Sequence, residues 1–558
     1  MKNLIALSFL FFGLNSFATT YYVSPTGNDN TGDGSLSMPY QTPSKALVSA
    51  NAGDIIELRQ GTYNTTTEIR ISQNNMTLRS YPGEKATLNC VTNIEDASAC
   101  IWFNEPDVTG GLLENLEIIG GYYYGVKLES NWDWGLPASQ RHGVSHVTIR
   151  NCNIHHTGRD CIKLTPGCNY TTIENCEIHH SGIGIANDPN DPNAEGIDNV
   201  NASYMRLRNS YIHHTSTSGV YTKGGAEYCM IEENLLTDIG EGGILLGFYT
   251  DSDWFNEVTN PTYYECRNSI ARNNIIIGTG GAGIGFWGAD HCEAYNNTVK
   301  TASPKYHTPL YFSQGEIWIS NSLTAMPQNV NCIVRNNIFI DESPMEDDSY
   351  TIEVRENSLV NCVIDYNCYF NTTGQATFDD NIAYPALIFA QWQTQYGFDT
   401  HSIEGNPSLN SNMHQLSASI CKDAGQNLNI AGFRDYDGGL RDNMPDMGAD
   451  EFEVGANTSV PPSPGTIGTG VVGAITAAIA AADAQLAFAC YPNPTTDKVF
   501  FSQTEGLCKV IDAKGILLFT QSISFTQNEV SLAHLPQGKY WIILENAGKR
   551  GIKGIVKE

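Results

Sequence analysis

Short runs in which apolar and polar residues alternate fill the middle of the chain, as at 161–164 (CIKL), 219–222 (GVYT) and 242–247 (GGILLG). Alternation with a period of two is typical of β-strands, and the Gly, Thr and Ser clusters between the runs indicate turns. The runs return about every 24 residues, with longer intervals between, which marks a repeat protein. Coils of this size with three short strands predict an all-β fold, a parallel β-helix, whose neighbouring strands lie about 4.8 Å apart.

Each coil carries the same phrase: an Asn, an apolar residue, a polar turn that ends in Thr-Gly or Ser-Gly, and then Gly-Ile-x-Leu. Because equivalent residues of successive coils stack, we expect the Asn to form a ladder inside a turn, each side-chain amide pairing with the next coil. Such a ladder is part of the architecture and is not expected to touch a ligand. The phrase occurs near Asn115, Asn151, Asn175, Asn209, Glu233, Asn273, Asn296, Asn336 and Asn367.

Changes in composition divide the chain into five parts. The N-terminus has one Lys, an apolar run too short to span a bilayer and small residues near Ala18, which is typical of a secretory signal peptide. A stretch rich in Pro, Gly, Thr and Ala follows the repeats and indicates a linker. We expect a signal peptide at 1–18, an N-terminal cap with the first coils at 19–110, the β-helix with loop insertions at 111–455, a flexible linker at 456–486 and a small β-sandwich-like domain at 487–558.

The formal net charge is −29, from 60 Asp and Glu against 31 Lys and Arg. A nucleic-acid-binding protein needs a basic face that releases counterions from phosphates, so this class is excluded. The composition favours a soluble extracellular protein, and the acidic excess has two alternative explanations, calcium binding and plain solubility. We further expect a monomer without a transmembrane anchor.

Fifteen cysteines in a secreted chain raise the question of disulfide bonds, but no CxxC or Cys/His spacing is typical of zinc. Cys152 and Cys176 occupy the same position in successive coils, where small apolar side chains stack. Candidate disulfide pairs are Cys90 with Cys100, Cys362 with Cys368, and Cys490 with Cys508.

Insertions lengthen alternate coils. They follow Leu128, Ala186 and Gly247, and a further one begins at Ser303. The first three follow a strand of the Gly-Ile-x-Leu type, so we expect them to leave the helix at one corner. Loops stacked there would form a wall beside a flat parallel sheet, and hence a groove long enough for a polymer.

These repeats resemble the right-handed parallel β-helix superfamily, which includes pectate, pectin, alginate and chondroitin lyases. The opening at 21–63 is similar to the N-terminal cap of family 9 and family 6 polysaccharide lyases, and the segment 435–453 is similar to the end of many secreted bacterial β-helix proteins. The tail contains YPNPTTDKVFF, VIDAKGILLF and LPQGKYWIIL, and it resembles a type A sorting domain of the type IX secretion system. The resemblances imply two partners, an extracellular polysaccharide and the type IX machinery, and a protein that is secreted or attached to the cell surface.

The Gly-Ile-x-Leu strands indicate where chemistry could occur. Apolar residues at alternate positions point inward, so x points outward. In successive coils x is Lys127, Lys163, Ala186, Tyr221 and Leu245. Lys127 and Lys163 would lie on neighbouring rungs, where like charges lower each other's pKa.

β-Elimination of a uronic acid polymer needs a group that neutralises the carboxylate and a base that takes the C5 proton. A Lys or Arg base with calcium beside it is common in the resembled lyases. We therefore expect Lys163 to act as the base, Arg159 and Lys127 to neutralise charge, and Tyr221 or Lys223 to contact the sugar. The alternative is that these are ordinary solvated side chains on an exposed sheet.

The loop at 187–198 is rich in the oxygen ligands that calcium prefers. Its predicted ligands are Asp188, Asp191, Glu195 and Asp198, and the alternative is a solvated acidic turn. Three tryptophans in neighbouring insertions could stack on sugar rings. They are Trp132, Trp134 and Trp254.

Three His pairs stack at one turn, at 155/156, 179/180 and 213/214. They could form a proton relay or a metal site, but we favour stacked turn residues at a corner other than that of Lys163.

The favoured function is a lyase that cleaves a uronic-acid-containing polysaccharide by β-elimination. The alternatives are a non-catalytic glycan-binding or structural surface protein, and a glycoside hydrolase on the same fold, although the Gly-His-Gly and Arg-Ile-Lys sequences of polygalacturonases do not occur.

Overall fold

In a computed structural model, the described residues are 18–131, 140–190, 192–320, 323–343, 350–356, 358–381 and 386–452, with 490–491, 498–501, 506–512, 517–523, 529–533, 535–546 and 549–557 in the tail. They form two compact units, one within residues 1–470 and one within 471–558. The expected signal peptide and linker lie almost entirely outside the described residues. None of the described helices is long and apolar enough to cross a membrane.

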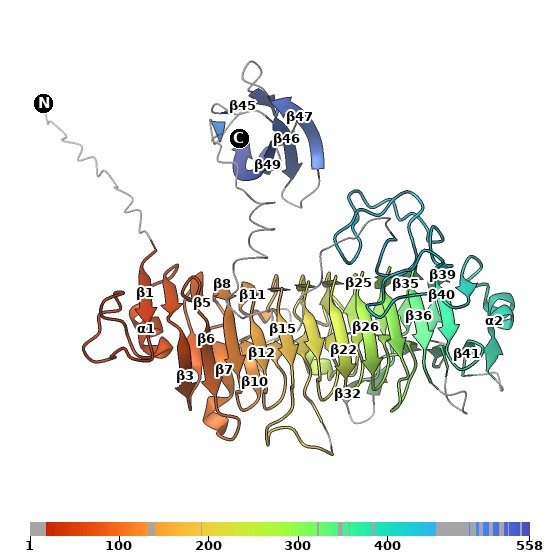
Figure 1. The fold of residues 1–558 in the computed structure, drawn as a ribbon, viewed down its shortest axis with the longest axis horizontal. Coiled ribbons are helices and arrows are strands. Elements are labelled where there is room, and N and C mark those ends of the chain that lie inside the picture. The colour runs from red at the N-terminus through yellow and green to blue at the C-terminus, as the bar shows by residue number, and fades with distance from the viewer. Residues whose placement is uncertain are drawn as a thin grey trace, which may run out of the picture. The chain divides into compact units, whose positions relative to one another are not determined.

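The first unit is a parallel β-helix, as the sequence predicts (Figure 1). The chain visits three 12-stranded sheets in turn, and each strand pairs with the equivalent strand of the next coil. Ile149, for example, lies opposite Ile173, and Ile173 lies opposite Leu207. Pairing within the three sheets is parallel except between the last two strands of sheet 3.

Sheet 1 contains β1 (Thr20–Val23), β2 (Ile55–Leu58), β5 (Met76–Ser80), β8 (Thr109–Glu114), β11 (Ser145–Arg150), β14 (Thr172–Glu174), β17 (Arg206–Arg208), β21 (Met230–Glu232), β25 (Ile270–Arg272), β29 (Glu293–Tyr295), β35 (Ile333–Arg335) and β39 (Val363–Asp365). Sheet 2 contains β3 (Gly61–Thr65), β6 (Ala86–Cys90), β9 (Leu116–Ile119), β12 (Asn153–His155), β15 (Glu177–His179), β18 (Tyr211–His213), β22 (Leu235–Ile239), β26 (Ile275–Thr279), β30 (Thr298–Thr301), β36 (Ile338–Asp341), β40 (Cys368–Asn371) and β43 (Ile403–Glu404).

Sheet 3 contains β4 (Ile69–Ile71), β7 (Ala99–Phe103), β10 (Tyr124–Leu128), β13 (Ile162–Leu164), β16 (Ile197–Val200), β19 (Val220–Lys223), β23 (Ile244–Leu246), β27 (Ile284–Trp287), β31 (Leu310–Ser313), β37 (Ile352–Val354), β41 (Thr377–Asp379) and β42 (Leu387–Ile388). A smaller sheet 4 lies between sheets 3 and 1 in chain order and contains β20 (Ala226–Glu227), β24 (Cys266–Arg267), β28 (Ala289–Asp290), β34 (Asn329–Val330) and β38 (Leu359–Val360). A hairpin is formed by β32 (Ile317–Ser320) and β33 (Leu323–Ala325).

Inward residues of the three sheets form one continuous apolar core. The two ends of this core are covered by short helices, α1 (Pro43–Ser49) and α2 (Phe389–Tyr396). Thr42 caps α1, because its hydroxyl accepts a hydrogen bond from the amide of Lys45. Trp392 of α2 is buried in the core and donates a hydrogen bond to Asp399 at 2.8 Å. Covering both ends removes the exposed apolar cross-section that a solenoid otherwise has.

Two positions of the repeated phrase have separate tasks. The first, as in Asn151 and Asn175, has φ near +50°, a left-handed conformation that Asn tolerates better than most residues. The second is the buried ladder. From Asn234, each side-chain amide donates to the next carbonyl oxygen at 2.9–3.0 Å through Asn274, Asn297, Asn337 and Asn367. The predicted ladder therefore exists, but one residue later than most of the Asn residues chosen from the sequence.

In earlier coils the ladder position holds Cys152, Cys176 and Ser210, which are buried small residues. All described cysteine side chains are free thiols, Cys90 and Cys100 included. Cys362 contacts Cys332, and Cys368 contacts Cys421, so the structure does not bring Cys362 and Cys368 together as a pair. The side chain of Cys490 lies outside the described residues.

The second unit has two antiparallel sheets. One contains β44 (Cys490–Tyr491), β45 (Lys498–Phe501) and β48 (Glu529–Ser531), and the other contains β46 (Gly506–Asp512), β47 (Leu517–Ile523), β49 (Gly538–Asn546) and β50 (Lys549–Lys557). Buried side chains from both sheets, such as Val499 and Ile542, share one apolar cluster. This arrangement agrees with the expected sandwich-like domain.

Candidate active site

The outer face of sheet 3 presents one aligned residue from each rung. Strand pairing places these residues opposite one another in the order Arg70, Trp102, Lys127, Lys163, Asp198, Tyr221, Leu245, Gly285, Tyr311 and Glu353. The prediction that Ala186 belongs to this row is wrong. Asp198 in β16 occupies the rung between Lys163 and Tyr221, and Ala186 lies in the loop before that strand.

One of the insertions also lies elsewhere than predicted. The segments after Leu128 and after Gly247 leave sheet 3 at the ends of its strands, as expected, and Arg141 of the first donates a hydrogen bond to the carbonyl of Asp253 in the second. The segment around Ala186 instead precedes its sheet 3 strand, so it lies on the opposite border of the sheet. The loops therefore flank the row from two sides and do not stack at one corner.

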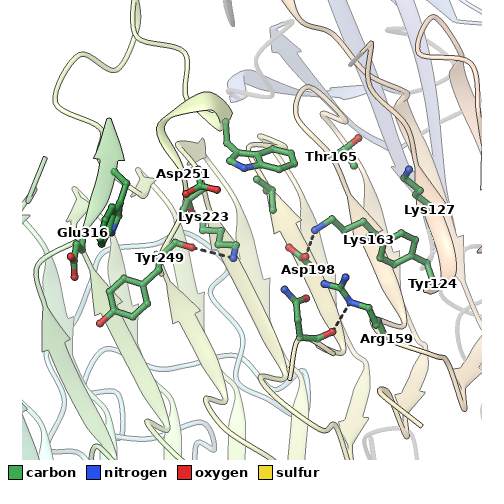
Figure 2. A pocket seen from close by; sticks show the side chains of 15 residues that line it. Tyr124, Lys127, Arg159, Lys163, Thr165, Asp198, Lys223, Tyr249, Asp251 and Glu316 are labelled. Atoms are coloured by element: carbon green, nitrogen blue, oxygen red, sulfur yellow. Dashed lines mark hydrogen bonds and ion pairs between the residues drawn. The ribbon is translucent and has the colours of Figure 1, made fainter. Parts of the chain in front are cut away.

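Between these loops lies a cleft of about 680 Å³. Its lining contains basic residues on the floor and aromatic residues from the insertions (Figure 2). Lys127, Arg159, Lys163 and Lys223 all line it, so the structure brings together the four basic residues singled out in the sequence. Its aromatic residues are Tyr124 of β10 and, from the insertions, Tyr249, Trp254 and Trp318.

Lys163 makes an ion pair with Asp198 of the next rung (Figure 2). Burial alone would lower the pKa of Lys163, but the charges of Asp198, Tyr124 and Asp160 outweigh it and raise the pKa above its ordinary value. The predicted lowering by Lys127 is therefore wrong, because the nearest charge is a carboxylate and not the second ammonium group.

Lys127 and Arg159 are also held by polar partners. The ammonium group of Lys127 lies 2.7 Å from Glu129, and it sits over the Trp102 ring at 5.1 Å. Arg159 donates a hydrogen bond from Nε to the carbonyl of Asn193 at 2.9 Å, which ties it to the loop that precedes β16 (Figure 2). Both cations face the cleft in fixed positions.

Lys223 differs from Lys163 because no ion pair holds it among the described residues. Its Nζ lies 3.3 Å from the carbonyl oxygen of Tyr249 and 4.2 Å from the centre of the Tyr221 ring. Tyr221 itself is only 1% exposed and stacks under Phe248 at 5.8 Å. The prediction that Tyr221 contacts sugar is corrected on this point, since its ring forms the support beneath Lys223 and has no free face.

Three buried carboxylates lie close together at the cleft: Asp160, Glu195 and Asp198, of which Asp198 also lines it. Each offers an oxygen within 4.8 Å of the other two. One oxygen on each of them is buried and accepts no hydrogen bond from the described residues, namely Oδ2 of Asp160, Oε2 of Glu195 and Oδ1 of Asp198. Unpartnered buried acceptors are costly, and a cation with oxygen ligands would satisfy all three, so these residues fit calcium.

Burial, mutual repulsion and neighbouring lysines shift the pKa values of these three carboxylates. Burial, followed by the charges of Glu195 and Asp198, raises the pKa of Asp160 well above its usual range. Burial and the charge of Asp198 also raise the pKa of Glu195. Burial would raise the pKa of Asp198 as well, but Lys163 and Lys223 hold it below its usual value. A divalent cation bound among these acids would favour their charged forms and offset the cost of burying them together.

Only some of the predicted calcium ligands lie in this cluster. Glu195 and Asp198 lie in the cluster. Asp188 is exposed and bonds to the neighbouring Asn190, so it is not a ligand of the same site. Asp191 lies outside the described residues. Asp160, which directly follows Arg159 in the sequence and is not among the predicted ligands, completes the group.

Of the tryptophans predicted to stack on sugar, Trp254 lines the cleft from a short 3₁₀ turn, Ser252–Trp254. Trp132 and Trp134 lie outside the described residues. Trp318, on β32, also lines the cleft and is 61% exposed, yet it was not predicted. It follows Glu316 and Ile317 in an insertion without the Gly-Ile-x-Leu pattern, so only its location in the insertion from Ser303 could have drawn attention to it.

Comparison with known proteins identifies the class of this molecule. Residues 21–199 match the family model of the Pel9A-like right-handed β-helix region, and residues 140–303 match that of the right-handed β-helix region. Residues 489–558 match the secretion-system C-terminal sorting domain. The chain is thus a secreted right-handed parallel β-helix protein with Pel9A-like N-terminal coils and a type IX sorting domain, as the resemblances imply.

Among solved structures, pectate lyase Pel9A shares 17% identity over 78% of this chain and 97% of its own, with a TM-score of 0.47. XylC, solved in complex with xylose, shares 12% identity over 70% of this chain and 87% of its own, with a TM-score of 0.45. A rhamnogalacturonan lyase shares 13% identity over 62% of this chain and 86% of its own, with a TM-score of 0.39. No curated protein sequence gives a significant match to this chain.

Proposed function

We propose that this protein is a secreted polysaccharide lyase that cleaves a uronic-acid-containing polymer by β-elimination. The observation that carries the proposal is the cleft on sheet 3, where a lysine that makes no ion pair with the described residues lies beside other cations and near a group of buried carboxylates. In β-elimination a base removes the C5 proton, the bond from C4 to the leaving oxygen breaks, and a C4–C5 double bond remains. The cleft contains a candidate for each requirement of this reaction.

Lys223 is the base in this proposal, in place of Lys163. Lys163 is paired with Asp198, which keeps it protonated, and a protonated amine cannot accept the C5 proton. Lys223 donates a hydrogen bond to a neutral carbonyl oxygen and packs on aromatic rings, and no carboxylate of the described residues lies within ion-pair distance of it. Lys127 and Arg159 are positioned to neutralise substrate carboxylates, and Trp254, Trp318 and Tyr249 to contact sugar rings.

Asp160, Glu195 and Asp198 are the proposed calcium ligands. Calcium bound there would supply positive charge near the substrate carboxylate and make the C5 proton more acidic. Asp198 is the member of the group that also lines the cleft, and its ion pair with Lys163 links the ligand group to the basic floor.

The experiment uses the secreted protein with pectate, alginate, chondroitin and ulvan, in calcium or in chelator. A lyase produces an unsaturated uronate that absorbs in the ultraviolet. A hydrolase produces reducing ends without that absorbance, which would point to two further carboxylates of the cleft lining, Asp251 and Glu316. Binding without either product would favour a glycan-binding protein, and both latter results would overturn the proposal.

Variants test the assigned roles. Lys223→Ala should lower kcat by about 10²- to 10⁴-fold, the usual contribution of general-base catalysis, while Lys300→Ala on sheet 2 should leave it unchanged. Asp198→Asn should weaken calcium binding measured by calorimetry, and Asp188→Asn in the exposed loop should not. Activity that survives in Lys223→Ala but is lost in Lys163→Ala would return the role of base to Lys163.

A further inference from the structure

Six histidines form two parallel stacks at the ends of three consecutive strands of sheet 2. The inner rings, His155, His179 and His213, are spaced 4.6 Å apart, with planes within 11° of parallel. The outer rings, of the residues that follow each of them, are spaced 4.7 and 5.0 Å apart. None of the six lines the cleft on sheet 3, and nothing in the proposed lyase reaction uses them.

Within each pair the two rings turn their Nδ1 atoms toward one another. The Nδ1–Nδ1 distances are 2.7 Å at 155/156, 2.6 Å at 179/180 and 2.8 Å at 213/214. Two lone pairs at this distance repel, so a proton or another cation must lie between them. Two imidazole nitrogens that bind one Zn²⁺ at about 2.0–2.1 Å each lie about 3.3 Å apart at the tetrahedral angle, so a pair would open by roughly half an ångström to hold an ion between its Nδ1 atoms.

Carboxylates lie on the far side of two of the three inner rings. Nε2 of His213 is within hydrogen-bond distance of Glu177 at 3.3 Å, and Nε2 of His155 lies at ion-pair distance from Glu117, 3.6 Å. A carboxylate accepts a hydrogen bond from Nε2–H, which leaves Nδ1 with its lone pair directed at the neighbouring ring. This carboxylate–imidazole arrangement is the usual outer shell of a metal-binding histidine.

The stack can be reached from solvent on its outer side. The outer rings remain partly accessible, and His214 is exposed, so an ion could enter from solvent.

We propose that this histidine stack binds one divalent transition-metal ion of the zinc, copper or nickel type through imidazole nitrogens of the 179/180 pair and an adjacent pair. Two groups of three histidines each offer nitrogens that lie within 4.8 Å of one another. One is His155, His156 and His179, and the other is His179, His180 and His213. Imidazole suits these borderline metals, whereas calcium prefers oxygen. A metal held this way joins neighbouring coils by side chains and stabilises the helix by mass action.

The test uses the full chain, purified without a polyhistidine tag and treated with chelator, then titrated with Cu²⁺ or Zn²⁺. We expect one ion per chain by calorimetry and elemental analysis, nitrogen coupling in the Cu²⁺ electron paramagnetic resonance spectrum, and a higher Tm with metal. The triple variant His156→Asn, His180→Asn, His214→Asn should bind at least about tenfold more weakly. Asn tolerates the left-handed φ of these positions, near +50°, so the fold is expected to survive.

A matched control is His146→Asn with His291→Asn, which replaces two histidines of the same backbone conformation outside the stack. This variant should bind metal as the parent does. Metal-free melting curves establish that all three proteins are folded. Absence of stoichiometric binding to the parent, or equal binding by the triple variant, would show that the rings only stack and would overturn the proposal.

Discussion

Single residues with a left-handed backbone turn the chain at the corner between sheets 1 and 2. Asn115, Asn151, Asn175 and Asn209 all have φ between +48° and +56°, and Glu233 and Tyr366 take the same conformation at equivalent positions. Side chains with a Cβ pay a steric penalty there, and Asn pays less than most because its short amide can bond locally. In the later coils the Asn amides also donate to the segment 405–452, as Asn336 does to the carbonyl of Gln426 at 2.9 Å.

Replacing Asn175 tests this backbone requirement. Asn175→Ala should lower the free energy of unfolding by about 1–2 kcal/mol, because Ala is strained at φ +52°, whereas Asn175→Gly should change it less. Thermal and denaturant unfolding of the two variants beside the parent protein measure the difference. An Ala variant as stable as the Gly variant would contradict the assigned role.

At the scale of strands and coils, the sequence predicts the architecture well and the site less well. Alternation along a strand fixes which residues face inward, because side chains of a strand point to opposite faces in turn. It cannot tell which strand a coil uses when an insertion contains a similar phrase. Gly184-Ile185-Ala186 and Gly196-Ile197-Asp198 both fit Gly-Ile-x, and only the second pairs with β13. The prediction from the sequence takes the first of these as the strand. It therefore omits Asp198 from the outward-facing row of sheet 3 and gives the wrong charged neighbour for Lys163.

The buried Asn ladder gives a prediction for one element. Asn297→Ala should lower the free energy of unfolding by about 1–3 kcal/mol, because it removes the amide that bonds to Asn337 and leaves Asn274 without its acceptor. Asn412→Ala, at an exposed loop position, serves as the control and should have little effect. Equal melting temperatures for the two variants would show that the ladder contributes little to stability.

At the scale of the whole first unit, the segment 405–452 returns along the outside of the coils (Figure 1). Asn273 and Asn296 of the helix donate to the carbonyls of Arg434 and Asp446 across this boundary. Within the segment, His414 lies 2.8 Å from Asp437. Its contacts join residues far apart in the sequence, which composition and periodicity do not reveal, and for this reason the sequence predicted only where the repeats end.

The His414–Asp437 pair makes stability depend on pH. The hydrogen bond and charge of Asp437 outweigh burial and raise the pKa of His414 to about 9, above the 6.5 of an unfolded histidine. The stabilisation is therefore complete below pH 6.5 and is lost as the pH rises through 9. His414→Gln should lower the Tm at pH 6 and have a much smaller effect at pH 10. His142→Gln, whose partner Asp107 is fully solvated, is the control and should show no such pH dependence.

The ladder also sets how the molecule would yield to mechanical force. Its hydrogen bonds join one coil to the next, so traction on the C-terminal end of the coils would peel them away one at a time and would not shear the whole sheet. The residues that separate successive ladder asparagines number 30, 40, 23 and 40 from Asn367 back to Asn234. A single-molecule extension trace would then show unequal increments of contour length in that order. Coils with long insertions would give force peaks that are further apart.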